Sequence, residues 1–437
     1  MKLTRRKFLI GSSLLPLSAQ DWEERISLEK IPQDQIRVLQ SVTDSDSTLI
    51  VVVAHKSRQL TFQIESPTAE NKAEFNSSKI DFKLTDFLIY QLHIKSLVPG
   101  NDYILKISDS QSGRTHQKIF HSLPEDFTKI KWGFLTCSSH RRAGPQRSMF
   151  QKLKSENLDA LIFAGDLVYA NSALDTGLGR PATPEQAVAI YVKTIFELDL
   201  YNFERLVPIF STWDDHDMAM NNATEDHPYL ELVTKIFRAF YPADSRIRTI
   251  SEGPGVAFSM KFKNFKLIFA DSRSFYNPDA KTLLGGRQLV WMLNELHGAG
   301  SISALVSSIQ FLDYGRLAEN VSESAPWEWE RITEWMRNSI NPTLLFSGDV
   351  HYSQIQKLDQ KSHGINSFEI TSSAMFSLSS GFFGKRGEDQ GQLAYYGFPN
   401  FLVFQNIKIE ERTCEMQIKC VSEKNDQQFL KQVILKT

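Results

Sequence analysis

Five apolar segments of the sequence each end in polar residues that could bind metal ions. The segments run into Cys137, Gly165-Asp166-Leu167-Val168-Tyr169, Trp213-Asp214-Asp215-His216-Asp217, Asp271-Ser272-Arg273 and Gly348-Asp349-Val350-His351. Buried carboxylates are costly without nearby cations, so the convergence of these acids at one point would require multivalent ions among them. The donors are mostly oxygens, with one thiol, one phenol and few imidazoles. This set fits a hard trivalent ion, calcium, magnesium or manganese better than two zinc ions.

The apolar segments that carry these residues are typical of strands buried on both faces of a sheet. They are Trp132–Thr136, Leu158–Ala164, Leu206–Thr212, Phe265–Ala270, Ser303–Ser307, Thr343–Ser347 and Phe368–Thr371. Helix-length amphipathic segments lie between them, at Pro184–Tyr201, Leu230–Tyr241, Gly286–Leu296 and Trp327–Ser339. The pattern predicts an α/β domain over residues 130–437, with ligands gathered at the carboxyl ends of its strands. Ser372–Gly397 is rich in glycine and serine and is predicted to be a surface loop near the site.

Residues 21–124 have a different pattern, because their short β-type segments are separated by turn residues. Phe82–Leu84 is one of the expected strands. The stretch Leu97–Tyr103 resembles the turn and tyrosine corner of a fibronectin or immunoglobulin-like sandwich, in which the Tyr103 hydroxyl bonds back to the backbone. We expect a structural β-sandwich module without chemistry of its own; the alternative is that it binds a surface ligand.

The composition is that of a globular protein with more than one domain. The chain has 437 residues, 41% of them hydrophobic, and its 49 basic residues nearly balance its 51 acidic ones. This excludes disorder and a coiled coil, and it gives no basic patch for nucleic acid. Three cysteines cannot form a disulfide framework, and Cys414 and Cys420 are expected to lie too far apart along one strand to bridge.

Residues 1–20 have the layout of an export signal, with a basic start and the short apolar run Phe8–Leu17. Thr4–Leu9 resembles a twin-arginine signal, which would make the twin-arginine export machinery a partner. An ordinary secretory signal is the alternative. No other hydrophobic stretch approaches 18 residues, so we expect an exported protein, periplasmic or extracellular, with no transmembrane anchor in the mature chain.

The strand-end motifs look like the ordered motifs of the alkaline phosphatase D (PhoD-like) family of calcineurin-like metallophosphoesterases. The likeness covers roughly Trp132 to Lys408, and an N-terminal β module is also typical of the family. It implies a metallophosphoesterase sandwich of β-sheets flanked by helices, preceded by a small all-β immunoglobulin-like domain. It also implies Fe³⁺ paired with Ca²⁺, with Mn²⁺, Mg²⁺ or Zn²⁺ as alternatives for the second metal. The ferric ligands would be Cys137, Asp166, Tyr169 and His351, and Asp166 would bridge to a second site formed by Asp215 or Asp214, Asn221 and Asp349.

The resemblance implies hydrolysis of phosphate mono- or diesters by a metal-bridging hydroxide. The expected catalytic residues are Asp166, Asp215 and His216, with His216 protonating the leaving group or binding phosphate while Asp214 or Asp217 orients its ring. Asp271 and Arg273 are expected to form a structural ion pair. The candidate phosphate-binding residues are Arg141, Arg142 and Arg180. Two alternatives remain: a phosphodiesterase or phospholipase D-like enzyme acting on lipid or cell-wall polymer phosphodiesters, and an inactive secreted binding protein.

Overall fold

The structure is a computed structural model. It describes residues 27–66, 72–139, 143–171, 181–298, 302–314, 319–372, 375–377, 380–381, 384–410 and 413–436. In this part of the chain no helix is both long enough and apolar enough to cross a membrane.

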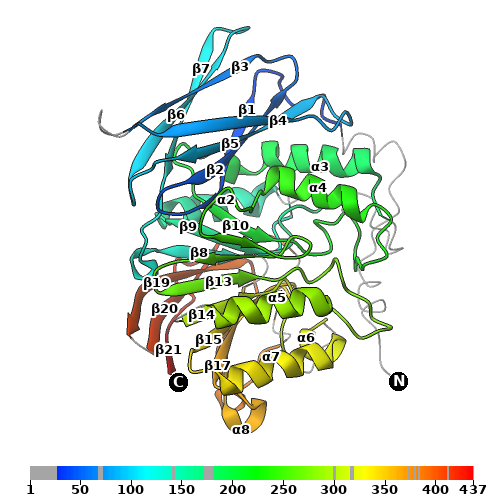
Figure 1. Ribbon diagram of the computed structural model, residues 1–437, viewed down its shortest axis with the longest axis vertical. Coiled ribbons are helices and arrows are strands. Elements are labelled where there is room, and N and C mark those ends of the chain that lie inside the picture. The colour runs from blue at the N-terminus through cyan, green and yellow to red at the C-terminus, as the bar shows by residue number, and fades with distance from the viewer. Residues whose placement is uncertain are drawn as a thin grey trace.

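The N-terminal module consists of two antiparallel sheets packed face to face (Figure 1). One has the strand order β1 (Ile36–Thr43), β2 (Thr48–His55), β5 (Phe87–Lys95), β4 (Glu74–Ile80), and the other β3 (Leu60–Glu65), β6 (Asp102–Asp109), β7 (Arg114–His121). The backbone N–H of Val98 donates to the Tyr103 hydroxyl at 2.7 Å, so the predicted tyrosine corner is present. The expected strand at Phe82–Leu84 is wrong, because Lys83 has φ = 60° and forms a turn with Asp81.

Two larger sheets form the rest of the molecule. The first has the order β10 (Ile209–Thr212), β9 (Ala160–Ala164), β8 (Trp132–Leu135), β19 (Asn400–Glu410), β20 (Thr413–Ser422), β21 (Phe429–Lys436). The second has the order β11 (Ile250–Glu252), β12 (Phe258–Lys261), β13 (Phe265–Phe269), β14 (Ile302–Val306), β15 (Thr343–Ser347), β17 (Ser367–Thr371), β16 (Ser353–Leu358), β18 (Gln392–Tyr396). Strands β8, β9 and β10 are parallel to one another, as are β13, β14, β15 and β17.

An aromatic and aliphatic core lies between these two sheets. The Trp132 ring stacks on Phe404 from its own sheet, with ring centroids 3.9 Å apart, and meets the edge of Phe346 from the other sheet at 5.4 Å. These large apolar side chains from the two inner faces interdigitate and hold the two sheets against each other. The three cysteines are free and buried, so the expectation that Cys414 and Cys420 do not bridge is confirmed.

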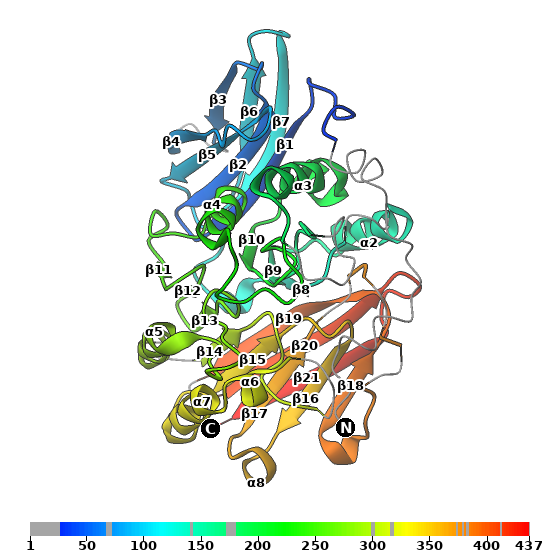
Figure 2. The same ribbon diagram turned by 90° about the vertical axis from the view of Figure 1, so that its right-hand side faces the viewer.

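Helices cover the outer faces of the sandwich (Figures 1 and 2). Helices α2 (Ala143–Ser155), α3 (Pro184–Glu197) and α4 (Leu230–Phe240) lie beside the first sheet, and α5 (Gly285–His297) and α7 (Pro326–Asn338) cover the second. The short elements are α6 (Val321–Ser324), α8 (Gln360–His363), η3 (Phe127–Lys129), η4 (Asp199–Asn202) and η5 (Glu388–Gln390). The predicted arrangement, β-sheets flanked by helices behind a small all-β sandwich, is therefore what the chain adopts.

The N-terminal module is docked on α3 and α4 by apolar and polar contacts. Phe87 of the module packs against Phe196 of α3, with ring centroids 5.2 Å apart. The Gln91 side chain donates to the carbonyl of Ala239 at 3.0 Å, and Lys118 donates to the carbonyl of Phe203 at 2.6 Å. These bonds satisfy carbonyls near the ends of helical segments, where intrahelical partners are missing. The module thus supports the helices that back the first sheet.

Candidate metal centre

The carboxyl ends of the parallel strands from the two large sheets meet at one place. Two glycines allow this close approach. A Cβ on Gly165 would lie 2.6 Å from the Asp214 Cβ, and a Cβ on Gly348 would lie 2.7 Å from the Thr136 methyl group. Any other residue at these positions would push the strand ends apart. The residues directly after the glycines, Asp166 and Asp349, are thereby brought into one cluster.

The backbone is strained at the same place. Among the described residues other than glycine, eleven have positive φ. Four of the eleven are predicted metal ligands: Cys137 (54°), Asp166 (57°), Asp349 (66°) and His351 (56°). This conformation is unfavourable for residues with a side chain, and it persists where the surroundings impose it, most often at functional sites. The strain turns these side chains sharply off the strand ends.

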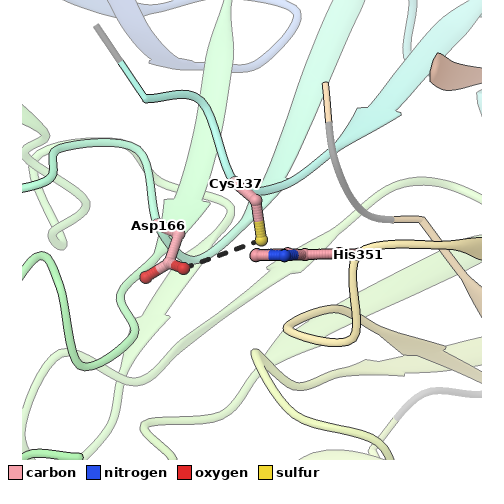
Figure 3. Close-up of side chains that lie close together, drawn as sticks. All are labelled: Cys137, Asp166 and His351. Carbon is pink, nitrogen blue, oxygen red and sulfur yellow. Dashed lines mark hydrogen bonds between the residues drawn. The ribbon is translucent and has the colours of Figure 1, made fainter. Parts of the chain in front are cut away.

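A first group of ligand atoms comes from Cys137, Asp166 and His351 (Figure 3). These atoms all lie within 4.8 Å of one another, and the Cys137 thiol is 3.6 Å from Oδ2 of Asp166. The Tyr169 hydroxyl donates to the same carboxylate oxygen at 3.1 Å. Ser377, which the sequence did not single out, lies 3.1 Å from Nε2 of His351 and 3.5 Å from the Tyr169 hydroxyl. Its segment, Ser372–Gly397, is thus not wholly a surface loop: Ser377 is buried and β18 begins at Gln392.

A second group shares Asp166 with the first. It comprises Asp166, Asp215 and His216, again with ligand atoms within 4.8 Å of one another. The backbone N–H of Asn222 donates to Oδ2 of Asp215 at 2.6 Å. Asn221, the predicted ligand, is half-buried beside it, but the buried amide oxygen without a hydrogen-bond partner belongs to Asn222. The Asn221-Asn222 pair in the sequence fits either assignment.

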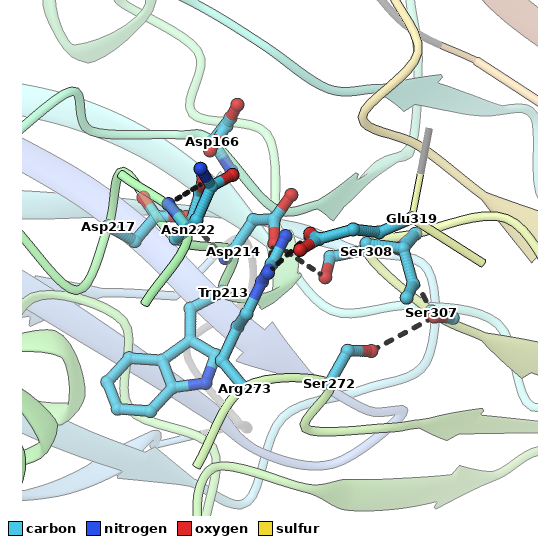
Figure 4. A network of polar contacts seen from close by, with 12 residues as sticks. Asp166, Trp213, Asp214, Asp217, Asn222, Ser272, Arg273, Ser307, Ser308 and Glu319 are labelled. Atoms are coloured by element: carbon cyan, nitrogen blue, oxygen red, sulfur yellow. Dashed lines mark hydrogen bonds and ion pairs between the residues drawn. The ribbon is translucent and has the colours of Figure 1, made fainter. Parts of the chain in front are cut away.

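Two further aspartates, Asp214 and Asp217, bind other groups of the protein (Figure 4). Asp217 accepts hydrogen bonds from the backbone N–H groups of Asp166, Val168 and Asp214, at 2.7, 2.7 and 2.9 Å. It thereby ties the loop after β9 to the loop after β10. Oδ1 of Asp214 is ion-paired with Arg273 and accepts from Ser308 at 3.1 Å.

The expected ion pair between Asp271 and Arg273 is wrong. The Asp271 carboxylate instead accepts from the indole N–H of Trp213 at 2.8 Å and from backbone N–H groups, including that of Val256 at 2.9 Å. The Arg273 side chain extends away from it, to Asp214 and, at 2.7 Å, to Glu319 (Figure 4). Asp271 is thus already satisfied by neutral donors, and the arginine compensates an acid of the central cluster.

The His216 ring is oriented by a residue that the sequence did not suggest. Its Nδ1 lies 2.7 Å from Oδ1 of Asn171, and the ring stacks on Tyr169 with centroids 4.2 Å apart. The expectation that Asp214 or Asp217 orients this ring is therefore wrong. Asp217 is bound by three backbone N–H groups and Oδ1 of Asp214 by Arg273, and the partner of the His216 Nδ1 is Asn171.

No family model matches the sequence, and no curated protein matches it. A solved structure described as "Structure of PhoD" superposes with a TM-score of 0.68 at 14% sequence identity, covering 92% of this chain and 92% of that chain. The chain has the PhoD fold. The family resemblance expected from the strand-end motifs is confirmed at the level of the fold, and the match spans both the β module and the two large sheets.

Within this PhoD fold, the clustered acids cannot all be charged without cations. The pKa of Asp166 is raised well above its usual range, mainly by burial and secondly by the negative charge of the neighbouring Asp214. Burial also raises the pKa of Asp214 to about 8, although Arg273 opposes the shift, and that of Asp217 to about 7. Oδ1 of Asp166 and Oδ2 of Asp214 are buried without a hydrogen-bond partner. Buried acceptor oxygens of this kind, beside a thiol, a phenol and imidazoles, fit bound cations.

These shifts predict how the stability of the metal-free protein depends on pH. The pKa values of Asp166, Asp214 and Asp217 are raised on folding, so the folded state holds more protons than the unfolded chain, and the stability this contributes is lost as pH rises through the folded values. His227, with a folded pKa of about 4, is already neutral in this range. We expect the melting temperature of chelator-treated protein to fall between about pH 6.5 and about pH 8.5. Added metal should reverse the fall; a rise with pH in chelator would contradict the shifts.

Some of the sequence predictions fall outside the described residues. These are the export signal at residues 1–20 and the phosphate-binding candidates Arg141, Arg142 and Arg180.

Proposed function

We propose that the protein is a metal-dependent phosphoesterase that hydrolyses phosphate monoesters, diesters or both. The observation that carries the proposal is the sharing of Asp166 by two ligand groups, because one bridging carboxylate is what a pair of adjacent cations requires. The PhoD fold supports the same class of reaction. A carboxylate cluster built only for stability would be a poor solution, since buried acids without cations destabilise the folded state.

The donor chemistry differs between the two groups. We propose Fe³⁺ for the group with Cys137, Tyr169 and His351, because a thiolate and a phenolate favour a strongly acidic ion. We propose Ca²⁺ for the group that contains Asp215, with Asp349 and an amide oxygen of Asn221 or Asn222 as further proposed ligands, since calcium prefers oxygen ligands; Mn²⁺, Mg²⁺ and Zn²⁺ are the alternatives. Asp166 belongs to both. When bound, two such cations would supply a hydroxide nucleophile near neutral pH and would neutralise the charge that develops on the phosphoryl oxygens.

The chain's own residues would hold and orient the reactants. Asp217 and Arg273 fix the two loops that carry Asp166, Asp214 and Asp215. His216, half-buried at the edge of the cluster, would deliver a proton to the departing oxygen or bind a phosphate oxygen. Arg141, Arg142 and Arg180 remain the candidates for binding the phosphate.

Replacing His216 by alanine is expected to lower kcat by about 10²–10⁴, with the metal content unchanged, if the residue transfers a proton. Activity toward an aryl phosphate and elemental analysis should be measured on the same samples. His297→Ala is the matched control. Lys266, at the start of β13, donates to the carbonyl of Glu295 near the end of α5. His297, the last residue of α5, therefore lies near the amino end of β13, whereas the ligand groups lie at the carboxyl ends of the strands. Full activity of His216→Ala would exclude the role, and loss of metal would make His216 a ligand instead.

The substrate class is tested by comparing hydrolysis of a mono-aryl and a bis-aryl phosphate, each with and without added calcium. We expect hydrolysis of at least one ester. A strong preference for the diester would favour lipid or cell-wall polymer phosphodiesters as substrates. No hydrolysis of either ester by metal-loaded protein would leave the secreted binding protein as the better reading.

We also propose that the protein is exported through the twin-arginine machinery to the periplasm or the cell exterior. The motif Arg5-Arg6 ahead of a short apolar run supports this route, and export of a folded protein would allow metals to be inserted first. Changing both arginines to lysine should retain the protein in the cytoplasm in a fractionation assay. Continued export would point to the ordinary secretory route.

A further inference from the structure

The orientation of His216 depends on a contact between the loops that follow β9 and β10. Asn171 is buried, and its Oδ1 lies 2.7 Å from Nδ1 of His216, while its Nδ2 has no hydrogen-bond partner among the described residues. The backbone N–H of the preceding Ala170 donates to the His216 carbonyl at 3.1 Å. The Tyr169 ring covers one face of the imidazole at 4.2 Å. Three consecutive residues thus hold one histidine.

The contact determines which ring nitrogen carries the hydrogen. An amide oxygen can only accept, so Nδ1 of His216 must be the donor, and the lone pair of the neutral ring is on Nε2 at the opposite edge. A ring nitrogen of His216 belongs to the ligand group with Asp166 and Asp215. Because Nδ1 is directed at Asn171, we infer that Nε2 is the nitrogen available to this group.

We propose that Asn171 is a positioning residue that holds His216 in the Nδ1–H tautomer and so presents Nε2 to the reacting centre. The inference rests on the proposed phosphoesterase function. With Nδ1–H held by a fixed acceptor, Nε2 can accept and release a proton, or bind a cation, without rotation of the ring. A neutral amide performs this task without adding another carboxylate to a site where Asp166 and Asp214 already have raised pKa values.

The tautomer can be measured without turnover. Nitrogen NMR of ¹⁵N-histidine-labelled, zinc-loaded full-length chain, recorded over a range of pH, distinguishes the two ring nitrogens. His216→Gln assigns the His216 signals by their loss. His297 is the internal reference, because its Nδ1 lies 2.7 Å from the Leu293 carbonyl and none of the substitutions is in this helix. We expect Nδ1–H at His216 in the wild type; Nε2–H there would overturn the proposal, and this test needs no variant of Asn171.

Two variants then separate positioning from packing. Asn171→Leu keeps the branching at Cγ but has no acceptor, and we expect it to lose the Nδ1–H signal and to lower kcat about 10–100-fold, with KM and metal content little changed. Asn171→Asp keeps an oxygen at this position and should restore both the tautomer and most of kcat. A purely structural role would predict loss of activity in both variants with the tautomer unchanged, and that outcome would overturn the inference.

The results also distinguish this inference from the proposed function. If the wild type hydrolyses neither ester while Asn171→Leu still changes the tautomer, the phosphoesterase proposal fails and the role of Asn171 stands. If the wild type is active and the His216 tautomer is the same in all variants, the inference fails and the proposed function stands.

Discussion

Asp166→Asn is expected to abolish metal loading and turnover together. The amide has nearly the shape of the carboxylate but no charge, and only one of its two terminal atoms can bind a cation, so it cannot serve both ligand groups that share this residue. Loss of the several kcal/mol that bound cations contribute to a transition state corresponds to a drop in kcat of roughly 10³-fold or more. Elemental analysis and the initial rate on an aryl phosphate should be measured on one preparation.

The same substitution should have the opposite effect on the metal-free protein. Burial beside four other aspartates raises the pKa of Asp166, so removal of its charge relieves repulsion. Chelator-treated Asp166→Asn should therefore melt at or above the temperature of the chelator-treated wild type, and added metal should stabilise the wild type alone. A variant that melts at or above the wild type in chelator but below it with metal identifies Asp166 as a metal ligand. An acid that only supports the fold would not give this reversal.

The control lies at the other end of the same strand. Asp159 comes directly before β9, and its carboxylate accepts from the backbone N–H of Lys131 at 2.8 Å, a bond that an asparagine oxygen can also accept. Asp159→Asn should keep both metals and full activity. Retention of both cations by Asp166→Asn would refute the bridging role of Asp166 and, with it, the central argument for a two-cation site.

The features that the sequence predicts well are those set by neighbours along the chain. An apolar run followed by Gly165-Asp166 or Gly348-Asp349 defines a buried strand and the acid at its carboxyl end without knowledge of the rest of the fold. The tyrosine corner is equally local, because Val98 and Tyr103 are five residues apart. The one feature that these local patterns do not give is the order of the strands, which brings the acids together.

The features that the sequence does not reveal depend on residues far apart along the chain. Asn171 and His216 are 45 residues apart, and Arg273 and Asp214 are 59 apart. Nothing in the pattern distinguishes Asp271 from Asp214 as the partner of Arg273, and proximity in the sequence favours the wrong one. The pairing is decided by the meeting of the ends of β10 and β13, which belong to different sheets. Ser377 reaches the Tyr169 hydroxyl across 208 residues for the same reason.

Arg273→Met is expected to cause a large loss of stability although Arg273 is in neither ligand group. The side chains of Arg273 and Asp214 are both fully buried, and the arginine also reaches Glu319. Breaking such a pair by removing one partner leaves an uncompensated buried charge, which typically costs about 3–5 kcal/mol. The matched control is Arg205→Met, because the pair of Arg205 with Asp102 is largely exposed and should be worth at most about 1 kcal/mol. Chemical denaturation of both variants at fixed metal concentration measures the difference.

The origin of the loss can be tested by pH and by a second substitution. Without the guanidinium, the pKa of Asp214 should rise further above the value of about 8 that it has beside Arg273. The variant can then relieve the lost pair by protonating the acid, so its deficit relative to the wild type should shrink as pH falls and grow as pH rises. Asp214→Asn in the Arg273→Met background should recover part of the stability, since the buried charge is gone. A deficit that is independent of pH and unchanged by Asp214→Asn would mean that Arg273 acts through packing alone, and that cations, not this arginine, neutralise Asp214.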